Sequence, residues 1–147
     1  MRTLAFIISA LSIALSLHAT AGDEENTPPI VGHVDKAVFS SGISNRQPVD
    51  DIVTLKNSRN VIYYYTELSN LKGRKISHAW YYQGKETSKV TFVVGASQQS
   101  VYSKKTLDRR HTGKWMVIVV DESGWALKAS VFQYLATQKS TKPSTAQ

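Results

Sequence analysis

Residues 60–82 of the chain read NVIYYYTELSNLKGRKISHAWYY. This stretch holds five of the seven tyrosines and one of the three tryptophans, in two runs of residues that favour strands. A polar loop that contains Asn70 and Gly73 joins the two runs. The pattern predicts two β-strands, at residues 61–68 and 75–82, that form the aromatic centre of the fold.

Further short runs of strand-favouring residues flank this centre, at residues 34–39, 88–94, 100–107, 114–120 and 125–135. Turn signals separate them, among them Gln83-Gly84, which predicts a tight hairpin turn. Residues 40–51 are polar and predict a loop connection. About seven antiparallel strands with no helical pattern predict an all-β domain of immunoglobulin-like β-sandwich type. A small closed barrel is the alternative.

Alternation along the strands predicts which side chains face the core. In the run 75–82 the inward set is Ile76, His78, Trp80 and Tyr82. In the last run we expect the buried set to be Trp125, Leu127, Ala129, Val131 and Gln133. The run WMVIVV at residues 115–120 is apolar on both faces, which predicts a central strand covered by the opposite sheet and by a loop or partner. For residues 61–68 the alternation does not decide which face of the strand points toward the core.

The N-terminus has the three parts of a secretory signal peptide: Arg2, the apolar run at residues 4–17 and the A-x-A sequence at 19–21. A membrane anchor is the alternative, but the apolar run is shorter than the ~20 residues that cross a bilayer. We therefore expect a signal peptide at 1–21, a flexible leader at 22–31, the folded domain at 32–135 and a disordered tail at 136–147. The mature protein is predicted to be periplasmic or secreted, with no integral membrane span.

The chain contains no cysteine and carries a formal net charge of +7. Disulfides form outside the cytoplasm, so the stability of an exported chain without them must come from its packed core. Arg2 is the only charged residue in the predicted signal peptide, so the mature protein stays basic. A basic exported protein meets an envelope protein, an anionic glycan or a lipid headgroup more readily than it meets nucleic acid.

Several motifs resemble the bacterial family of unknown function DUF2914. They are NRQPVD at residues 45–50, YYYTELSNLKGRKISHAWYYQGK at 63–85, YSKKTL at 102–107 and GKWMVIVVDESGWAL at 113–127. The likeness runs from Val34 to Phe132, while GASQQSV at residues 95–101 departs from it. The resemblance implies an exported β-domain that often serves as an accessory module, and it supplies no catalytic residues.

No catalytic, metal or cofactor site is predicted. His78 lies on the predicted inward face, where a core histidine with both ring nitrogens hydrogen-bonded is the expected role. Neither His33 nor His111 has ligand-like spacing to it, and a metal site needs several converging ligands. No G-x-S-x-G motif occurs. A hydrolase or transferase of envelope polymers that uses His78 or His111 is the alternative function.

Two groups of residues are predicted to bind a ligand. The basic group is Lys104, Lys105, Arg109 and Arg110, with His111 and Lys114 beside it, and it could hold an anion or simply be a solvated loop. The aromatic group is Tyr81 with Tyr63 or Tyr64, whichever faces outward. If their strands are neighbours, these tyrosines form an exposed stripe. We therefore expect a non-catalytic binding or adaptor module for an envelope component or partner protein.

Overall fold

The structure is a computed structural model, and it describes residues 31–138. Within this range the chain forms ten strands and no helix. Their bounds are β1 His33–Ser40, β2 Ile43–Ser44, β3 Gln47–Pro48, β4 Thr54–Lys56, β5 Val61–Ser69, β6 Lys75–Tyr82, β7 Lys85–Val93, β8 Gln98–Thr106, β9 Gly113–Asp121 and β10 Ala126–Leu135. All seven predicted runs form strands. The short strands β2 and β3 lie inside the connection predicted as a loop.

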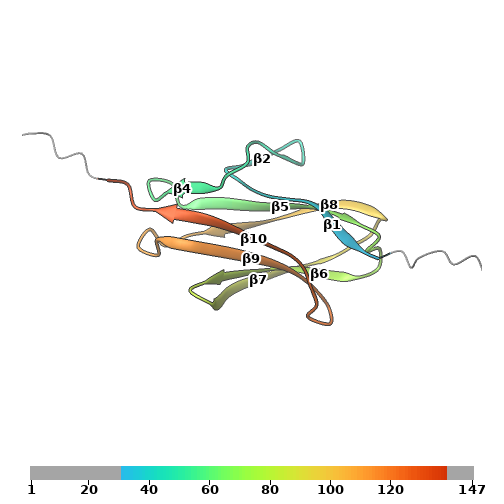
Figure 1. The fold of residues 1–147 in the computed structure, drawn as a ribbon. Helices are drawn as coiled ribbons and strands as arrows, with labels where there is room; N and C mark the ends of the chain where they lie inside the picture. The colour runs from blue at the N-terminus through green and yellow to red at the C-terminus, as the bar shows by residue number, and fades with distance from the viewer. Residues whose placement is uncertain (1–30, 139–147) are drawn as a thin grey trace, which may run out of the picture.

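Two sheets face each other across a common core (Figure 1). One sheet has the strand order β1-β5-β8 and the other β4-β10-β9-β6-β7, while β2 and β3 form a separate hairpin. The two main sheets are separate and do not close into a barrel. The predicted all-β sandwich is therefore confirmed, and the alternative of a closed barrel is not. The seven predicted strands pair with one another antiparallel, as expected, and the additional short strand β4 pairs with β10 in parallel.

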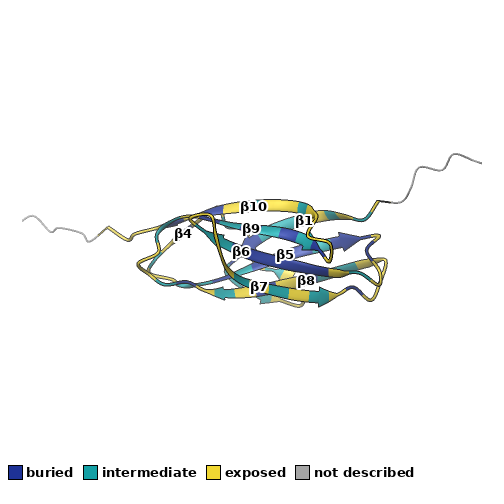
Figure 2. Ribbon diagram, turned by 90° about the horizontal axis from the view of Figure 1, so that it is seen from below, coloured by how far each residue is buried: buried dark blue, intermediate teal, exposed yellow. Residues whose placement is uncertain are grey.

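The aromatic stretch supplies both sheets, with β5 in the middle of the three-stranded sheet and β6 inside the five-stranded one. Their inward side chains form the core together with those of β9 and β10, and β6 is buried along most of its length (Figure 2). Ile76, His78 and Trp80 are fully buried and Tyr82 is half-buried, which confirms the inward face predicted for this strand. Strand β9 is central, as its apolar sequence predicts.

The predicted face of β10 is wrong except at Leu127, which is partly buried and packs against the core. Phe132 and Tyr134 are buried, whereas Val131 is 51% exposed and Trp125 is 72% exposed. The register with β9 pairs Phe132 with Trp115, and an irregularity between Ala126 and Lys128 interrupts the ladder. The pairing aligns the aromatic rings of both strands on the inner face, and this outweighs the alternation that the sequence of β10 shows by itself.

Polar side chains connect the two sheets through the core. Thr66 and Ser103 of the three-stranded sheet bond the two ring nitrogens of His78 on β6, at 3.0 and 2.9 Å. The indole nitrogen of Trp80 donates to the same Ser103 hydroxyl at 3.1 Å. Within residues 31–138 no buried side-chain nitrogen or oxygen lacks a hydrogen-bond partner. The hydrogen bonds within the core therefore replace those that these polar groups would make with water in the unfolded chain.

The predicted signal peptide lies outside the described residues, as does the leader except for Val31. Of the predicted tail, residues 136–138 are described and the rest is not. None of the described residues forms a helix long and apolar enough to cross a membrane.

Candidate functional site

Several turns meet at one end of the sandwich, on the left in Figure 1. The β6–β7 turn, the β8–β9 loop, the turn before β5 and the end of β10 all lie there. Backbone hydrogen bonds link them: Leu107 donates to the carbonyl of Asn60 at 2.7 Å, and Asn57 donates to the carbonyl of Leu135 at 2.8 Å. We call this region the basic end because of its charges.

Basic residues outnumber acidic ones at the basic end. The basic side chains there are Lys56, Arg59, Lys85, Lys104, Lys105, Arg109, Arg110 and Lys114, and the acidic ones are Glu86, Asp108 and Asp50, whose charge interacts with that of Arg59. At the opposite end charges of both signs occur together, and Arg74 forms ion pairs with Asp121 and Glu122 at 2.7 and 3.0 Å. The positive charge of the domain is therefore concentrated toward one end.

Three aromatic rings form a continuous stack at the basic end. The ring of Tyr82 stacks on Trp115 on one side, with centroids 4.8 Å apart, and on His111 on the other, with centroids 5.1 Å apart. The Tyr82 hydroxyl donates to the carbonyl of Thr112, and the Trp115 indole donates to the carbonyl of His111. These bonds fix the β8–β9 loop against β6. The stack leads from a buried tryptophan to an exposed imidazole.

The predicted basic group is not a single patch. Arg110 bonds the Asp108 carboxylate through its Nε and Nη2 at 3.0 and 2.6 Å, and these bonds lower the pKa of Asp108. Lys105 points toward the gap between the sheets, where it donates to Ser88 at 2.7 Å, and burial lowers its pKa. Lys104 and Arg109 are exposed. Exposed Lys85 and Lys114, from neighbouring strands, join them at the basic end.

Two depressions flank the β6–β7 turn. Gln83 and Gly84 form this turn with positive φ values of 50° and 77°, which confirms the predicted tight hairpin turn. One depression, of about 440 Å³, is lined by Tyr81, Tyr82, Gln83, Gly84, Thr112, Gly113, Lys114 and Met116. The other, of about 590 Å³, is lined by Tyr82, Gln83, Lys85, Glu86, Thr87 and His111. Each depression combines aromatic rings with a lysine.

The predicted tyrosine stripe does not form. Tyr64 is fully buried, and its hydroxyl bonds the Ser130 hydroxyl at 2.8 Å; burial raises its pKa to about 12. Tyr63 faces outward on β5 and Tyr81 outward on β6, but these strands belong to different sheets. The two rings therefore lie on opposite outer faces. Sequence patterns did not reveal the roles of Tyr82 and His111, whose rings only the β8–β9 loop brings together.

The two histidines of the alternative function differ in their surroundings. His78 has no exposed surface, its two ring nitrogens bond hydroxyl groups, and burial lowers its pKa to about 3. The ring of His111 is exposed and stacked on Tyr82. Among residues 31–138 neither of these rings hydrogen-bonds a carboxylate. No three histidine or acidic side chains in the same range converge as metal ligands would.

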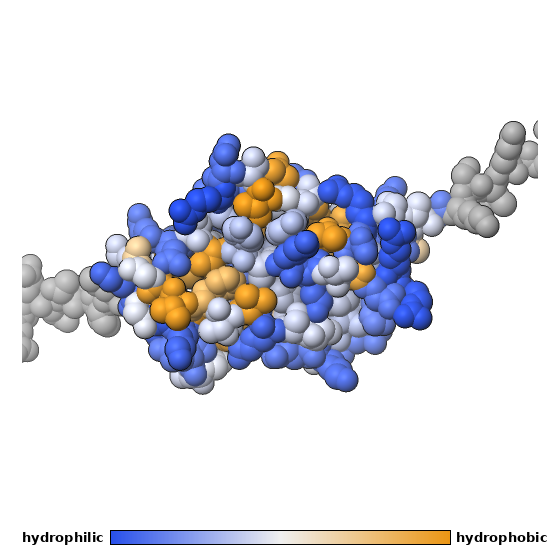
Figure 3. All heavy atoms as spheres, turned by 180° about the vertical axis from the view of Figure 1, so that it is seen from behind, coloured by the Kyte–Doolittle hydropathy of each residue, from blue (hydrophilic) through white to orange (hydrophobic). Residues whose placement is uncertain are grey.

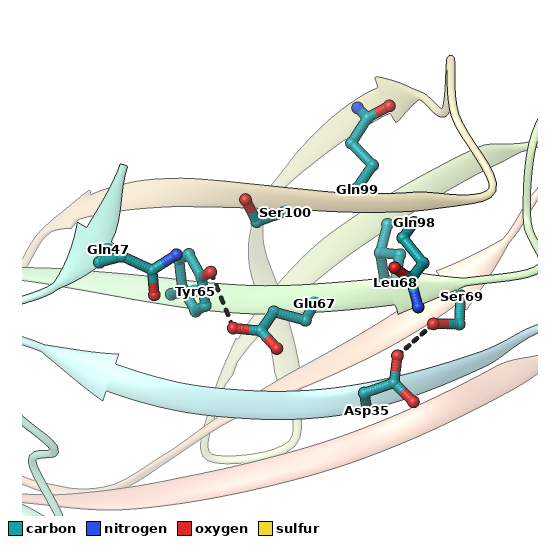
Figure 4. Close-up of a pocket in the computed structure, with 9 residues that line it drawn as sticks. All are labelled: Asp35, Gln47, Tyr65, Glu67, Leu68, Ser69, Gln98, Gln99 and Ser100. Carbon is teal, nitrogen blue, oxygen red and sulfur yellow. Dashed lines mark hydrogen bonds between the residues drawn. The ribbon is translucent and has the colours of Figure 1, made fainter. Parts of the chain in front are cut away.

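A polar depression lies on the outer face of the three-stranded sheet, away from the basic end (Figure 4). Its volume is about 290 Å³, and its lining residues are Asp35, Gln47, Tyr65, Glu67, Leu68, Ser69, Gln98, Gln99 and Ser100. We call it the glutamine pocket. The rear view of the molecule shows hydrophobic patches separated by hydrophilic side chains (Figure 3). The described surface thus offers several small, chemically distinct regions.

Comparison with known proteins gives one family match and structural likenesses. No curated protein matches the sequence significantly. Among solved structures, a crystal structure of a Niemann-Pick type C2 protein from Japanese carpenter ant is similar, with 10% identity and a TM-score of 0.41, over 73% of this chain and 93% of the other. So low a score says nothing about what the chain binds. The family model described as protein of unknown function (DUF2914) matches residues 73–134, in agreement over this part of the chain with the resemblance seen in the sequence motifs.

Proposed function

We propose that this domain is a non-catalytic binding module outside the cytoplasm, which holds an anionic polysaccharide of the cell envelope at its basic end. The observation that carries the proposal is the stack of Trp115, Tyr82 and His111, which leads to an exposed ring beside Lys85. An aromatic face and lysine ammonium groups together suit a sugar ring that bears a carboxylate or sulfate.

The available charges support an extended anionic ligand. Lys85, Lys104, Arg109 and Lys114 are exposed and none of them forms an ion pair within residues 31–138. They belong to separate strands and to the β8–β9 loop, so they surround the end of the domain. A polymer with repeated charges can contact several of them at once, and the summed field also attracts it from a distance.

The surroundings of His78 support a non-catalytic role. A catalytic base must reach the proton that it removes. The ring of His78 is fully buried, and both of its nitrogens are engaged by the hydroxyls of Thr66 and Ser103. This arrangement serves packing between the sheets. The alternative, an enzyme acting on envelope polymers, would have to use the exposed His111.

The test is a pair of charge-reversal variants with the same change of net charge. Lys85→Glu with Arg109→Glu alters the basic end, and Lys72→Glu with Lys75→Glu alters exposed lysines at the opposite end. Retention on immobilised sulfated and carboxylated polysaccharides is measured at low salt. We expect the first variant to bind at least about tenfold more weakly and the second to bind nearly like the parent protein.

Other outcomes would contradict the proposal. Equal losses in the two variants would mean that net charge alone drives binding. Binding to anionic lipid vesicles with none to polysaccharide would show that the ligand is a membrane surface. Thermal unfolding of each variant controls for loss of the fold, since all four side chains are exposed and their substitution should leave the core intact.

A further inference from the structure

The glutamine pocket has a wall that is fixed in place. The β2–β3 hairpin brings Gln47 against the outer face of β5, where it approaches Tyr65 (Figure 4). The carboxylate of Asp50 anchors the base of this hairpin by accepting from the Ser40 hydroxyl at 2.8 Å and the Ser41 backbone N–H at 2.7 Å. The remaining wall comes from β8. The pocket is therefore built from segments distant in sequence and does not depend on one mobile loop.

The two carboxylates at its floor are held by neighbours. Tyr65 is fully buried, and its hydroxyl donates to Glu67 at 3.0 Å. The Ser69 hydroxyl donates to Asp35. Both pairs line the same depression, and in Figure 4 Gln47 lies beside Tyr65 while Gln98 lies beside the Asp35–Ser69 pair. Because each carboxylate already accepts a hydrogen bond, its orientation is set before any ligand arrives, which lowers the entropic cost of binding.

Basic side chains lie close to these carboxylates. His33 forms an ion pair with Asp35 at 2.8 Å, and a hydrogen bond to the Val31 carbonyl, followed by the effect of Asp35, raises the pKa of His33. Lys36 is the register partner of Glu67 in the β1–β5 ladder but forms no ion pair with it, and its ammonium lies 5.9 Å from the centre of the Tyr65 ring. The carboxylates disfavour an anionic ligand, and the neighbouring His33 and Lys36 weaken the attraction for a cationic one.

The remaining polar side chains that line the pocket are uncharged, and most of them make no hydrogen bond to other described residues. Within residues 31–138 the side chains of Gln47, Gln98 and Ser100 make no hydrogen bond, whereas Gln99 accepts from the backbone of Gly95. A carboxamide offers donors and an acceptor, and a hydroxyl offers both. The second oxygen of Glu67 adds another acceptor. This mixture matches a ligand that carries many groups able both to donate and to accept.

We infer that the glutamine pocket is a second binding site, which takes a neutral sugar unit of a glycan. A sugar hydroxyl both donates and accepts, so it can pair with a carboxamide and a carboxylate at the same time. The volume of about 290 Å³ suits one small ligand. The inference does not depend on the proposed function, because the pocket lies away from the basic end and its ligand carries no charge.

The test uses heteronuclear NMR with neutral oligosaccharides of glucose and of N-acetylglucosamine as probes. We expect shifts of the side-chain amide signals of Gln47 and Gln98 and of backbone amides in β5 and β8. The double variant Gln47→Ala with Gln98→Ala should bind about tenfold more weakly or worse, since it removes hydrogen bonds to the ligand. The control is Gln133→Ala, an exposed glutamine on the other sheet, which should bind like the parent.

Three results would overturn the inference. The first is that none of these neutral sugars shifts the NMR signals of the pocket, and the second is that lysine- or arginine-rich peptides shift them instead. The third is that the Gln133→Ala control loses as much affinity as the double variant. Two crossed measurements separate this site from the basic end. The Lys85→Glu, Arg109→Glu variant should keep neutral-sugar binding, and the Gln47→Ala, Gln98→Ala variant should keep its retention on anionic polysaccharide. Each proposal can therefore fail while the other stands.

Discussion

His78 connects the two sheets of the sandwich through the core. It lies in the five-stranded sheet and is bonded on both ring nitrogens by hydroxyls of the three-stranded sheet. The rings of Tyr64 and Phe92 pack against it edge-on, with centroids 4.9 and 5.0 Å away. No carboxylate bonds this ring within residues 31–138, so nothing near it offsets a positive charge. The folded protein therefore holds the neutral imidazole.

This predicts a stability that falls in acid. Burial lowers the pKa of His78 from 6.5 to about 3 in the folded protein, so between these pH values the unfolded chain binds a proton that the folded protein excludes. The free energy of unfolding should therefore decrease as pH falls below about 6.5, by up to about 1.4 kcal/mol per pH unit. Urea unfolding at a series of pH values measures the slope.

The variant His78→Gln is the control for this pH effect. It cannot take up the proton, so its unfolding free energy should change less between pH 6.5 and pH 5, although it is less stable at neutral pH because one inter-sheet bond is lost. Carboxylate protonation contributes to both proteins and cancels in the comparison. Parallel slopes for the parent and the variant would show that His78 is not the group responsible.

Among the elements, β10 shows how pairing decides a face that its sequence leaves ambiguous. Both alternating sets of this strand contain large apolar residues, with Trp125, Leu127 and Val131 in one and Phe132 and Tyr134 in the other. The ladder with β9 places Phe132 in the core, where its ring centroid lies 4.7 Å from that of Phe39. The turn before the strand is organised by Asp121, which accepts from the backbone of Ser123 and Trp125 at 2.9 Å.

Two substitutions in β10 test this register. Phe132→Ala should destabilise the domain by about 3–5 kcal/mol, because it leaves a cavity in the aromatic core. Val131→Ala should cost less than about 1 kcal/mol, because that side chain is 51% exposed. Chemical denaturation of both variants gives the two values. Comparable losses, or a larger loss for Val131→Ala, would mean that the strand presents its other face to the core.

At the scale of the whole molecule, the two candidate sites lie apart and differ in charge. The basic end carries exposed lysines and arginines, and the glutamine pocket carries two carboxylates with His33 and Lys36 nearby. The two sites lie toward opposite ends of the sandwich. Strand β5 starts at the basic end, and the glutamine pocket lies near the end of the same strand. One glycan with both neutral and charged units could contact both regions.

The difference in charge predicts a difference in salt dependence. Retention on anionic polysaccharide should be lost as sodium chloride rises from about 0.1 M to about 1 M, because the screening length falls from about 10 Å to about 3 Å. Binding of a neutral oligosaccharide at the glutamine pocket should hardly change over the same range. NMR titrations and column retention at both salt concentrations provide the comparison. Neutral-sugar binding that weakens as steeply as retention would contradict the assignment of a neutral ligand.

The sequence by itself determined the strands, the β6–β7 turn, the inward face of β6 and the resemblance to a known family over part of the chain. These depend on local properties: the period of two along each strand, the Gln-Gly turn residues and the short sequence motifs between residues 45 and 127. Only the tertiary structure decided the face of β10, the burial of Tyr64 and the composition of both candidate sites. The strands β5 and β6 are neighbours in sequence but belong to opposite sheets, so Tyr63 and Tyr81 are separated. Which residues meet across two sheets depends on long-range pairing, and no local pattern encodes it.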